Sequence, residues 1–280
     1  LGELAVGVIL GNLSLLGFAA LEPLETNAYI ELLAQLGVLV LLFSVGLEST
    51  VGEMKRVGVP SLVVAVLGVV TPWVLGGGVG RLLIPEHSTY AHVFLGATLT
   101  ATSVGITARV LQDLGRSKSA EAKIIRGAAV IDDVLGLVIL SLVTGLIAAA
   151  NAGSALSYIA IGGIVAKASV FLFGSLIIGV WLSPRLFGFA FRLRSPGVLL
   201  TVGLAFCFLL SFLSGRIGLA PIVGAFAAGL ILEPVHYRNF VTRGEHQLEE
   251  SVKPIAAFLV PVFFVVMGMR VDASTFARAE

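Results

Sequence analysis

Two adjacent aspartates, Asp132 and Asp133, lie inside the apolar stretch of residues 127–140. A charged side chain at the centre of a membrane-spanning helix costs about 3 kcal/mol even on insertion scales, so such residues are rare and usually functional. No basic residue lies closer in the sequence than Arg126. The pair therefore predicts a site that binds and releases a cation or protons. The alternative is a carboxylate pair that only stabilises the structure.

A second polar group interrupts residues 95–107, where five residues carry hydroxyl groups and two are glycines. Ser and Thr compete for backbone hydrogen bonds, and Gly lowers helix stability by about 1 kcal/mol relative to Ala. We expect helical hydrogen bonding to lapse between Thr100 and Gly105. There, freed carbonyl groups and helix ends would face an ion, as in the broken helices of transporters. The alternative is a continuous helix whose hydroxyl groups bond to its own turns.

The two aspartates are expected to have different roles. Neighbouring residues on an α-helix point about 100° apart, so Asp132 and Asp133 cannot both face one small cavity. One can face the ion path while the other pairs with a neighbour. An intramembrane aspartyl protease would need two carboxylates on separate elements, and no other apolar segment supplies an aspartate. Lys167, near the middle of another apolar segment, is a candidate charge partner for Asp132, or it lines a wet interface.

The composition is that of a membrane protein. The 280 residues are 57% hydrophobic and only 12% charged, whereas a soluble domain carries about 25% charged residues. The net charge of +1, without a basic tract, gives no indication of nucleic-acid binding. The single Cys207 excludes an intrachain disulfide. The four histidines lack the spacing of metal ligands, and we expect no cofactor.

About 20 apolar residues are needed to cross the hydrocarbon core of a membrane. Nine apolar segments approach or exceed that length, and turn-forming residues separate them. They cover residues 1–20, 29–48, 58–84, 90–111, 120–150, 155–182, 197–215, 218–233 and 252–271. The predicted fold is an all-α, polytopic membrane helix bundle of about nine transmembrane helices, one of them broken.

Lys and Arg residues are distributed unevenly between the two sides of this bundle. The loops after the second, fourth, sixth and eighth segments carry thirteen of them, the other side carries four, and Lys167 belongs to neither. Cytoplasmic loops carry an excess of Lys and Arg, so residue 1 is predicted to lie inside and residue 280 outside. Glu3 and Glu48, near cytoplasmic segment ends, are interpreted as solvated interface carboxylates.

The beginning and the end of the chain repeat each other at a constant offset of 222 residues. Gly7 and Gly46 then fall on Gly229 and Gly268. Because the two copies start at the first and the eighth segments, they enter the membrane in opposite directions. Such inverted-topology repeats are typical of secondary transporters, and a chance match of small residues is the alternative.

The repeat predicts three parts of the chain. Residues 1–150 would form the first repeat, with five helices, and residues 151–195 a linking helix. Residues 196–280 would form a partial, truncated second repeat, because partners for the third to fifth segments would begin near residue 280.

The motifs resemble those of bacterial sodium/proton antiporters, in the branch of the monovalent cation:proton antiporter superfamily that also holds potassium/proton efflux systems. The resemblance covers essentially the whole chain. It is carried by Gly2-Glu-Leu4 with Gly7 and Gly11, Val45-Gly-Leu-Glu48, Ala101-Thr-Ser-Val-Gly-Ile-Thr107, Ile131-Asp-Asp133, Gly218-Leu-Ala-Pro-Ile-Val-Gly224, and Pro261-Val-Phe-Phe264 with Gly268.

This resemblance implies that Asp133 binds the metal cation and the proton in turn, and that a lysine holds Asp132. It also implies that Thr102 and Ser103 belong to the broken helix. The acid pair favours sodium or lithium and net charge movement. Family members have about thirteen helices, so we expect this chain to lack several, including the one that carries the partner lysine.

We therefore expect a secondary active transporter, not an enzyme, that exchanges a monovalent cation, sodium first, for protons by alternating access. We expect a multi-pass homodimer in the inner (cell) membrane. A potassium/proton antiporter and a truncated, non-transporting membrane subunit are the alternatives. A cation channel would need rings of charged groups or carbonyls, and the sequence contains no filter-like segment.

Overall fold

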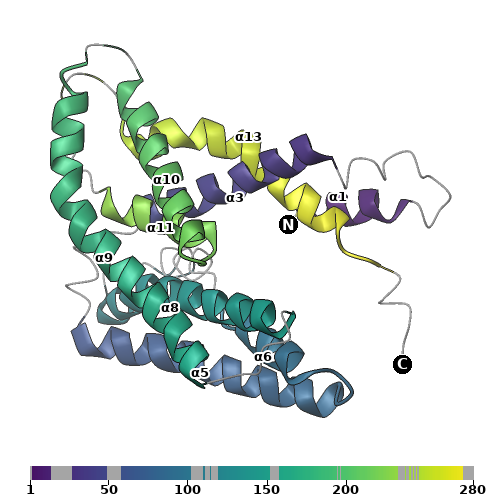
Figure 1. Cartoon of the computed structure of the whole chain (residues 1–280). Coiled ribbons are helices and arrows are strands. Elements are labelled where there is room, and N and C mark those ends of the chain that lie inside the picture. The colour runs from purple at the N-terminus through teal and green to yellow at the C-terminus, as the bar shows by residue number, and fades with distance from the viewer. Residues whose placement is uncertain are drawn as a thin grey trace. The chain divides into compact units, whose positions relative to one another are not determined.

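The computed structural model describes residues 2–13, 27–48, 58–101, 110, 114, 119–151, 158–193, 195, 197–232, 237, 240, 242, 244 and 246–273. These residues form α-helices joined by turns, without a β-strand in the described ranges (Figure 1). The prediction of an all-α fold is confirmed for this part of the chain. In order, the helices are α1 (Gly2–Gly11), α3 (Ala28–Glu48), α5 (Gly58–Leu83), α6 (Thr89–Thr98), α8 (Ala120–Asn151), α9 (Tyr158–Ala190), α10 (Val198–Arg216), α11 (Pro221–Ile231) and α13 (Leu248–Met269).

Six of the described helices, α3, α5, α8, α9, α10 and α13, are long and apolar enough to cross a membrane. Helices α1 and α11 are shorter apolar helices, and α6 has ten residues. The chain is therefore a multi-pass membrane protein. Each of the nine predicted segments overlaps one of these described helices, but nine membrane crossings stay a prediction.

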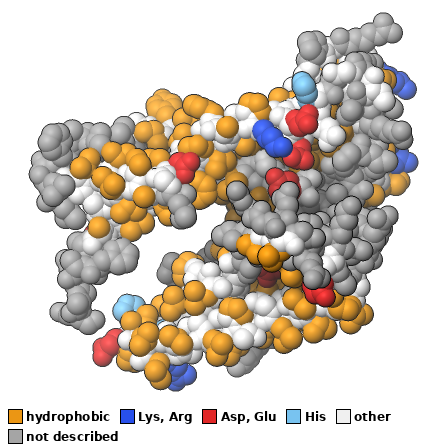
Figure 2. Space-filling view, turned by 180° about the vertical axis from the view of Figure 1, so that it is seen from behind, with side chains coloured by type: hydrophobic (Ala, Val, Ile, Leu, Met, Phe, Trp, Pro, Cys, Tyr) orange, Lys and Arg blue, Asp and Glu red, His pale blue; other side chains and the backbone are white. Residues whose placement is uncertain are grey.

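Among the described residues in Figure 2, apolar side chains far outnumber charged ones. Helix α5 illustrates how they are arranged: its large side chains, such as Leu67 and Leu82, are exposed. Its buried positions are mostly small residues four or seven apart along the helix, namely Ser61, Ala65, Val69, Gly76 and Gly80. Lipid tails are as apolar as leucine, so an exposed face of this kind is suited to lipid.

The helices pack as two compact units. Unit 1 comprises Leu1–Glu48, Gly179–Leu213 and Gly224–Glu280, and unit 2 comprises Ser49–Ile178 and Ser214–Val223. Unit 1 therefore contains α1, α3, α13 and most of α10 and α11, whereas unit 2 contains α5, α6, α8 and the first part of α9. Packing units and sequence repeats divide a chain by different criteria, so the predicted repeat boundaries stay predictions.

The part of helix α11 that belongs to unit 1 is fully buried, because every residue from Gly224 to Leu232 is buried. A helix that is apolar on all sides needs neighbours on all sides. Gly224 gives α10 access to the α11 backbone, since a Cβ atom there would overlap the Leu210 carbonyl group. On α9, Gly179 leaves room for the side chain of Ile231.

Two pairs of glycines allow close helix crossings in unit 1. Gly7 of α1 lies against Gly268 of α13, and Gly46 of α3 lies against Gly229 of α11. A Cβ atom on any of the four would overlap the backbone of the other helix, and small residues are what such close approach requires. The 222-residue offset places Gly7 on Gly229 and Gly46 on Gly268, so it converts one crossing into the other.

Candidate functional site

Asp132 and Asp133 occupy successive positions on α8, within the span Gly127–Ile147. Both side chains are half-buried, whereas Val134 and Leu137 on the same helix are buried. Asp132 takes part in at least one polar or electrostatic interaction. Two ionised carboxylates on neighbouring residues repel each other, so a proton or a cation bound at one of them relieves that repulsion.

The depth of the pair follows from its position along α8. With a rise of 1.5 Å per residue, Asp133 lies about 9 Å from Gly127 and about 21 Å from Ile147 along the helix axis. The hydrocarbon core is about 30 Å thick. A carboxylate at this depth is within the apolar layer and nearer to the end of α8 that the charge distribution predicts to be cytoplasmic.

Helix α6 ends at Thr98, well inside the apolar segment 90–111. The N–H group of Thr100 donates to the Ala97 carbonyl at 3.2 Å, which is the tighter bonding of a final turn. Two hydroxyl groups bond to carbonyls of the same turn: Thr98 Oγ1 to Leu95 at 2.8 Å and Thr100 Oγ1 to Ala97 at 2.8 Å. The hydroxyl groups thus share these carbonyls with backbone N–H groups, since Leu95 also accepts from Leu99 and Ala97 from Thr100.

Thr102, Ser103 and Gly105, the residues of the predicted broken-helix site, lie outside the described residues, and their role stays a prediction. What the structure does bring together is the helix that precedes them and the helix that carries the aspartates. Within unit 2, α6 packs against both α5 and α8, and α5 packs against α8 (Figure 1). The end of α6 and the aspartate pair therefore belong to the same packed unit.

Lys167 lies on the part of α9 that belongs to unit 2, and its side chain is exposed. Its predicted pairing with Asp132 stays a prediction. Among the described residues, no three His, Cys, Asp or Glu side chains are grouped as a metal centre would need. A cation transported at Asp133 would therefore rely on other oxygen ligands.

Tyr237 is the titratable group outside the spanning helices whose environment is most distinctive. It is buried and packs against Phe187, with ring centroids 6.2 Å apart. Burial, assisted by the negative charge of Glu249, raises the pKa of Tyr237 to about 12. The phenol therefore stays protonated throughout the physiological range and does not take part in proton uptake.

Comparison with known proteins decides the family. The family model described as "Sodium/hydrogen exchanger, transmembrane" matches residues 1–279. The chain belongs to the sodium/hydrogen exchanger family. Its predicted resemblance to monovalent cation:proton antiporters is thereby confirmed.

Three relatives within this family are named as antiporters. The high-affinity Na+/H+ antiporter NhaS3 of Synechocystis is 39% identical over 274 residues, which are 97% of this chain and 57% of the relative. A probable Na+/H+ antiporter of Bacillus cereus, GerT, is 35% identical and covers 97% of this chain and 67% of itself. The Na+/H+-K+ antiporter GerN of Bacillus cereus is 34% identical, with coverages of 97% and 65%. The chain thus spans about three fifths to two thirds of the length of these exchangers.

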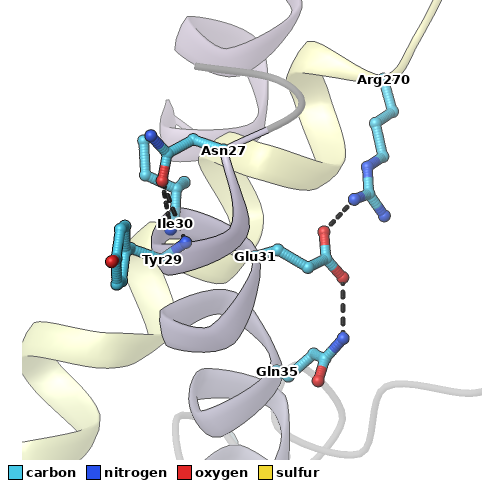
Figure 3. A network of polar contacts seen from close by, with 6 residues as sticks. All are labelled: Asn27, Tyr29, Ile30, Glu31, Gln35 and Arg270. Carbon is cyan, nitrogen blue, oxygen red and sulfur yellow. Dashed lines mark hydrogen bonds and ion pairs between the residues drawn. The ribbon is translucent and has the colours of Figure 1, made fainter. Parts of the chain in front are cut away.

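One ionic group of this chain was not predicted from the sequence (Figure 3). Glu31, in the first turn of α3, accepts from Gln35 Nε2 at 3.0 Å and forms an ion pair with Arg270 at the end of α13. Asn27 caps α3 by accepting two N–H groups of the first turn, at 2.9 and 3.3 Å. Arg270 was counted only among the Lys and Arg residues of the outer side, and Glu31 had no predicted role. Only the repeat offset could have indicated that the two helices meet.

Proposed function

We propose that this chain carries the ion site of a secondary transporter that exchanges sodium for protons across the inner (cell) membrane. The observation that carries the proposal is the pair of adjacent, half-buried carboxylates inside a spanning helix. Membership of the exchanger family and the names of three relatives support it. We also propose that the transporter acts as a homodimer.

In this mechanism, Asp133 binds the cation and the proton in turn. Deprotonated Asp133 takes a sodium ion from one side of the membrane, the site becomes accessible to the other side, and protons replace the ion. Competition for a single carboxylate couples the two fluxes, because both ligands cannot occupy it together. The coupling requires that the cation and the proton bind with comparable free energies at the working pH. Asp132 keeps a partner through the cycle, and Lys167 is one candidate for that role.

Additional ligands for the cation would come from Thr102, Ser103 and the backbone around Gly105. A single carboxylate cannot replace the hydration shell of a sodium ion, so hydroxyl and carbonyl oxygens are needed. Broken helices in transporters supply such carbonyls. The end of α6 at Thr98 supports this assignment, since the chain leaves helical hydrogen bonding just before these residues.

Alternating access would involve movement of the bundle that carries α6 and α8. Unit 2 contains both helices and packs internally as a separate unit, which supports its movement as one bundle. Unit 1 is the natural scaffold, because its glycine crossings join helices far apart in the sequence.

The inverted repeat is part of the same proposal, and the packing of unit 1 supports it. If a two-fold axis relates the two repeats, each contact between them must have an equivalent contact at the positions that the axis exchanges. The offset of 222 residues exchanges the Gly7–Gly268 crossing with the Gly46–Gly229 crossing. It also relates Gly37 to Leu259, and the backbones of these two residues lie against each other.

A potassium/proton exchanger is the second candidate, because the name of one relative, GerN, includes potassium. The experiment is reconstitution of the full-length protein into proteoliposomes that contain a pH-sensitive dye. We expect an imposed sodium gradient to drive proton movement, with a smaller response to potassium. A larger response to potassium would favour the second candidate. No response to sodium, lithium or potassium would favour a non-transporting subunit and overturn the proposal.

A further inference from the structure

Opposite charges meet at both ends of the α3–α13 contact. At one end, Arg270 pairs with Glu31 (Figure 3). At the other end, Glu48, the last residue of α3, exerts a weak electrostatic attraction on Lys253 in the second turn of α13, smaller than that of Glu249 on the same helix. Because the start of each helix lies near the end of the other, α3 and α13 run antiparallel.

The spacing of these charges matches in the two helices. Glu31 and Glu48 are seventeen residues apart, and so are Lys253 and Arg270. A helix rises 1.5 Å per residue, so both separations are about 25 Å. This is close to the hydrocarbon thickness of about 30 Å, and no other charged residue lies between the members of either pair along its helix. The charges therefore bracket the apolar part of the contact.

The two charges on each helix have the same sign, and the two helices have opposite signs. Both charges of this set on α3 are acidic, and both on α13 are basic. The 222-residue offset relates Glu31 to Lys253 and Glu48 to Arg270, so the two repeats carry opposite signs at equivalent positions. An antiparallel pairing of α3 with a second α3 would place acid against acid, and a pairing of two α13 helices would place base against base.

We infer that these four residues specify the pairing of α3 with α13 and hold the two helices together as one rigid element throughout the transport cycle. Specificity of this kind needs both attraction for the correct partner and repulsion of the wrong one. Repeats that descend from the same helix need such discrimination, because their apolar faces are alike. The rigidity rests on the proposed function, since it assumes alternating access, whereas the pairing does not.

The two ends are expected to contribute unequally. Lys253 is also bonded to Glu249 on its own helix, with Nζ 2.8 Å from Oε1, so part of its charge is already compensated. The Arg270 guanidinium has Glu31 as its ion-pair partner. Changes at the Glu31–Arg270 end should therefore have the larger effect.

Charge reversal tests the pairing in lipid nanodiscs. E31K and R270E each place like charges together and should lower the melting temperature by about 2–4 °C. This is the shift typical of a modest change in the free energy of unfolding for a chain of this size. The double variant E31K/R270E restores opposite charges at this end, with the signs exchanged between the two helices, and it should recover most of the loss. The control E86K changes an exposed residue of the α5–α6 turn and should have no effect. A double variant as unstable as the sum of the single variants would overturn the pairing.

Cross-linking tests the rigidity. In the variant E31C/R270C, a short flexible thiol cross-linker should join α3 to α13 within one chain, and Cys207 is buried and should not compete. We expect the cross-linked transporter to keep sodium-driven proton exchange. Exchange that stops on cross-linking and returns when a cleavable linker is cut would overturn the rigid element, as would cross-links formed only between two chains. Absence of exchange in the unmodified protein would instead reject the proposed function, and the charge-reversal experiment would still test the pairing.

Discussion

The two units differ in where their charges lie and in how far along the sequence their contacts reach. Unit 1 is held by contacts between distant residues, such as Gly7 with Gly268, and its ion pair between Glu31 and Arg270 is at helix ends. In unit 2, α5 packs against α6, the next helix in Figure 1, and the carboxylates of Asp132 and Asp133 lie inside a span. A unit with charges at its ends is suited to hold its shape in a membrane. A unit with charges at depth is suited to exchange ligands.

The largest expected effect concerns unit 2. Asp133→Asn keeps the size and shape of the side chain but removes the charge that binds the cation and the proton. Sodium-driven proton movement in proteoliposomes should fall to the level of empty liposomes, while the melting temperature is retained. Asp272→Asn, outside the spanning helices, is the matched control and should exchange normally. Normal exchange in the Asp133 variant would remove it from the mechanism.

Asp132→Asn should separate the roles of the two acids. We expect a lower melting temperature or reduced charge movement, because Asp132 interacts with its surroundings, and only a small change in the half-saturating sodium concentration. Both quantities can be measured on the same reconstituted sample. A large loss of sodium affinity at unchanged stability would show that the roles are reversed.

The glycine crossings of unit 1 predict an intermediate effect on stability. In Gly229→Ala, the new Cβ atom overlaps the α3 backbone near Phe43, and overpacking of this kind costs about 1–3 kcal/mol. The repeat predicts a similar cost for Gly7→Ala. The control Gly188→Ala on α9 adds a methyl group in open space and should be neutral or slightly stabilising. Equal melting temperatures for all three variants would mean that the crossings are not tightly packed.

The smallest effect is a loss of stability at alkaline pH. The pKa of Tyr237 is about 12 in the folded chain, above the ordinary value of 10.0, because burial disfavours the phenolate. The stability that this residue provides is complete below pH 10 and is lost as the pH rises from 10 to 12. At pH 11 the loss should be about 1 kcal/mol. The melting temperature should fall less between pH 9 and pH 11 in Tyr237→Phe than in the parent. An equal fall in both proteins would contradict the raised pKa of Tyr237.

The sequence was sufficient to predict the helices and the family, because both depend on local patterns. Apolar runs located the segments that overlap the described helices. The predicted lapse between Thr100 and Gly105 lies mostly outside the described residues and stays a prediction, although α6 ends just before it, at Thr98. The Ile131-Asp-Asp133 motif carried the resemblance. These features need no knowledge of which helices touch.

What the sequence did not predict depends on helix pairing. Glu48 is exposed, as its interpretation as a solvated interface carboxylate requires, but its electrostatic attraction to Lys253 was not predicted. Arg270 was counted only as a loop charge. Hydropathy cannot indicate that α3 lies along α13, since every face of an apolar helix is similar. The burial of α11 on all sides was missed for the same reason, because lipid and protein neighbours favour the same residues.

The most direct test of competition at Asp133 is the half-saturating sodium concentration of exchange as a function of pH. Protons and sodium are expected to compete for this carboxylate. At pH values below the pKa of the site, mass action then requires that this concentration rises about tenfold per pH unit of acidification for each proton displaced. The maximal rate should change much less. The same slope should be present in Asp272→Asn. A half-saturating concentration that does not change with pH, with only the maximal rate varying, would contradict binding of both ions at one site.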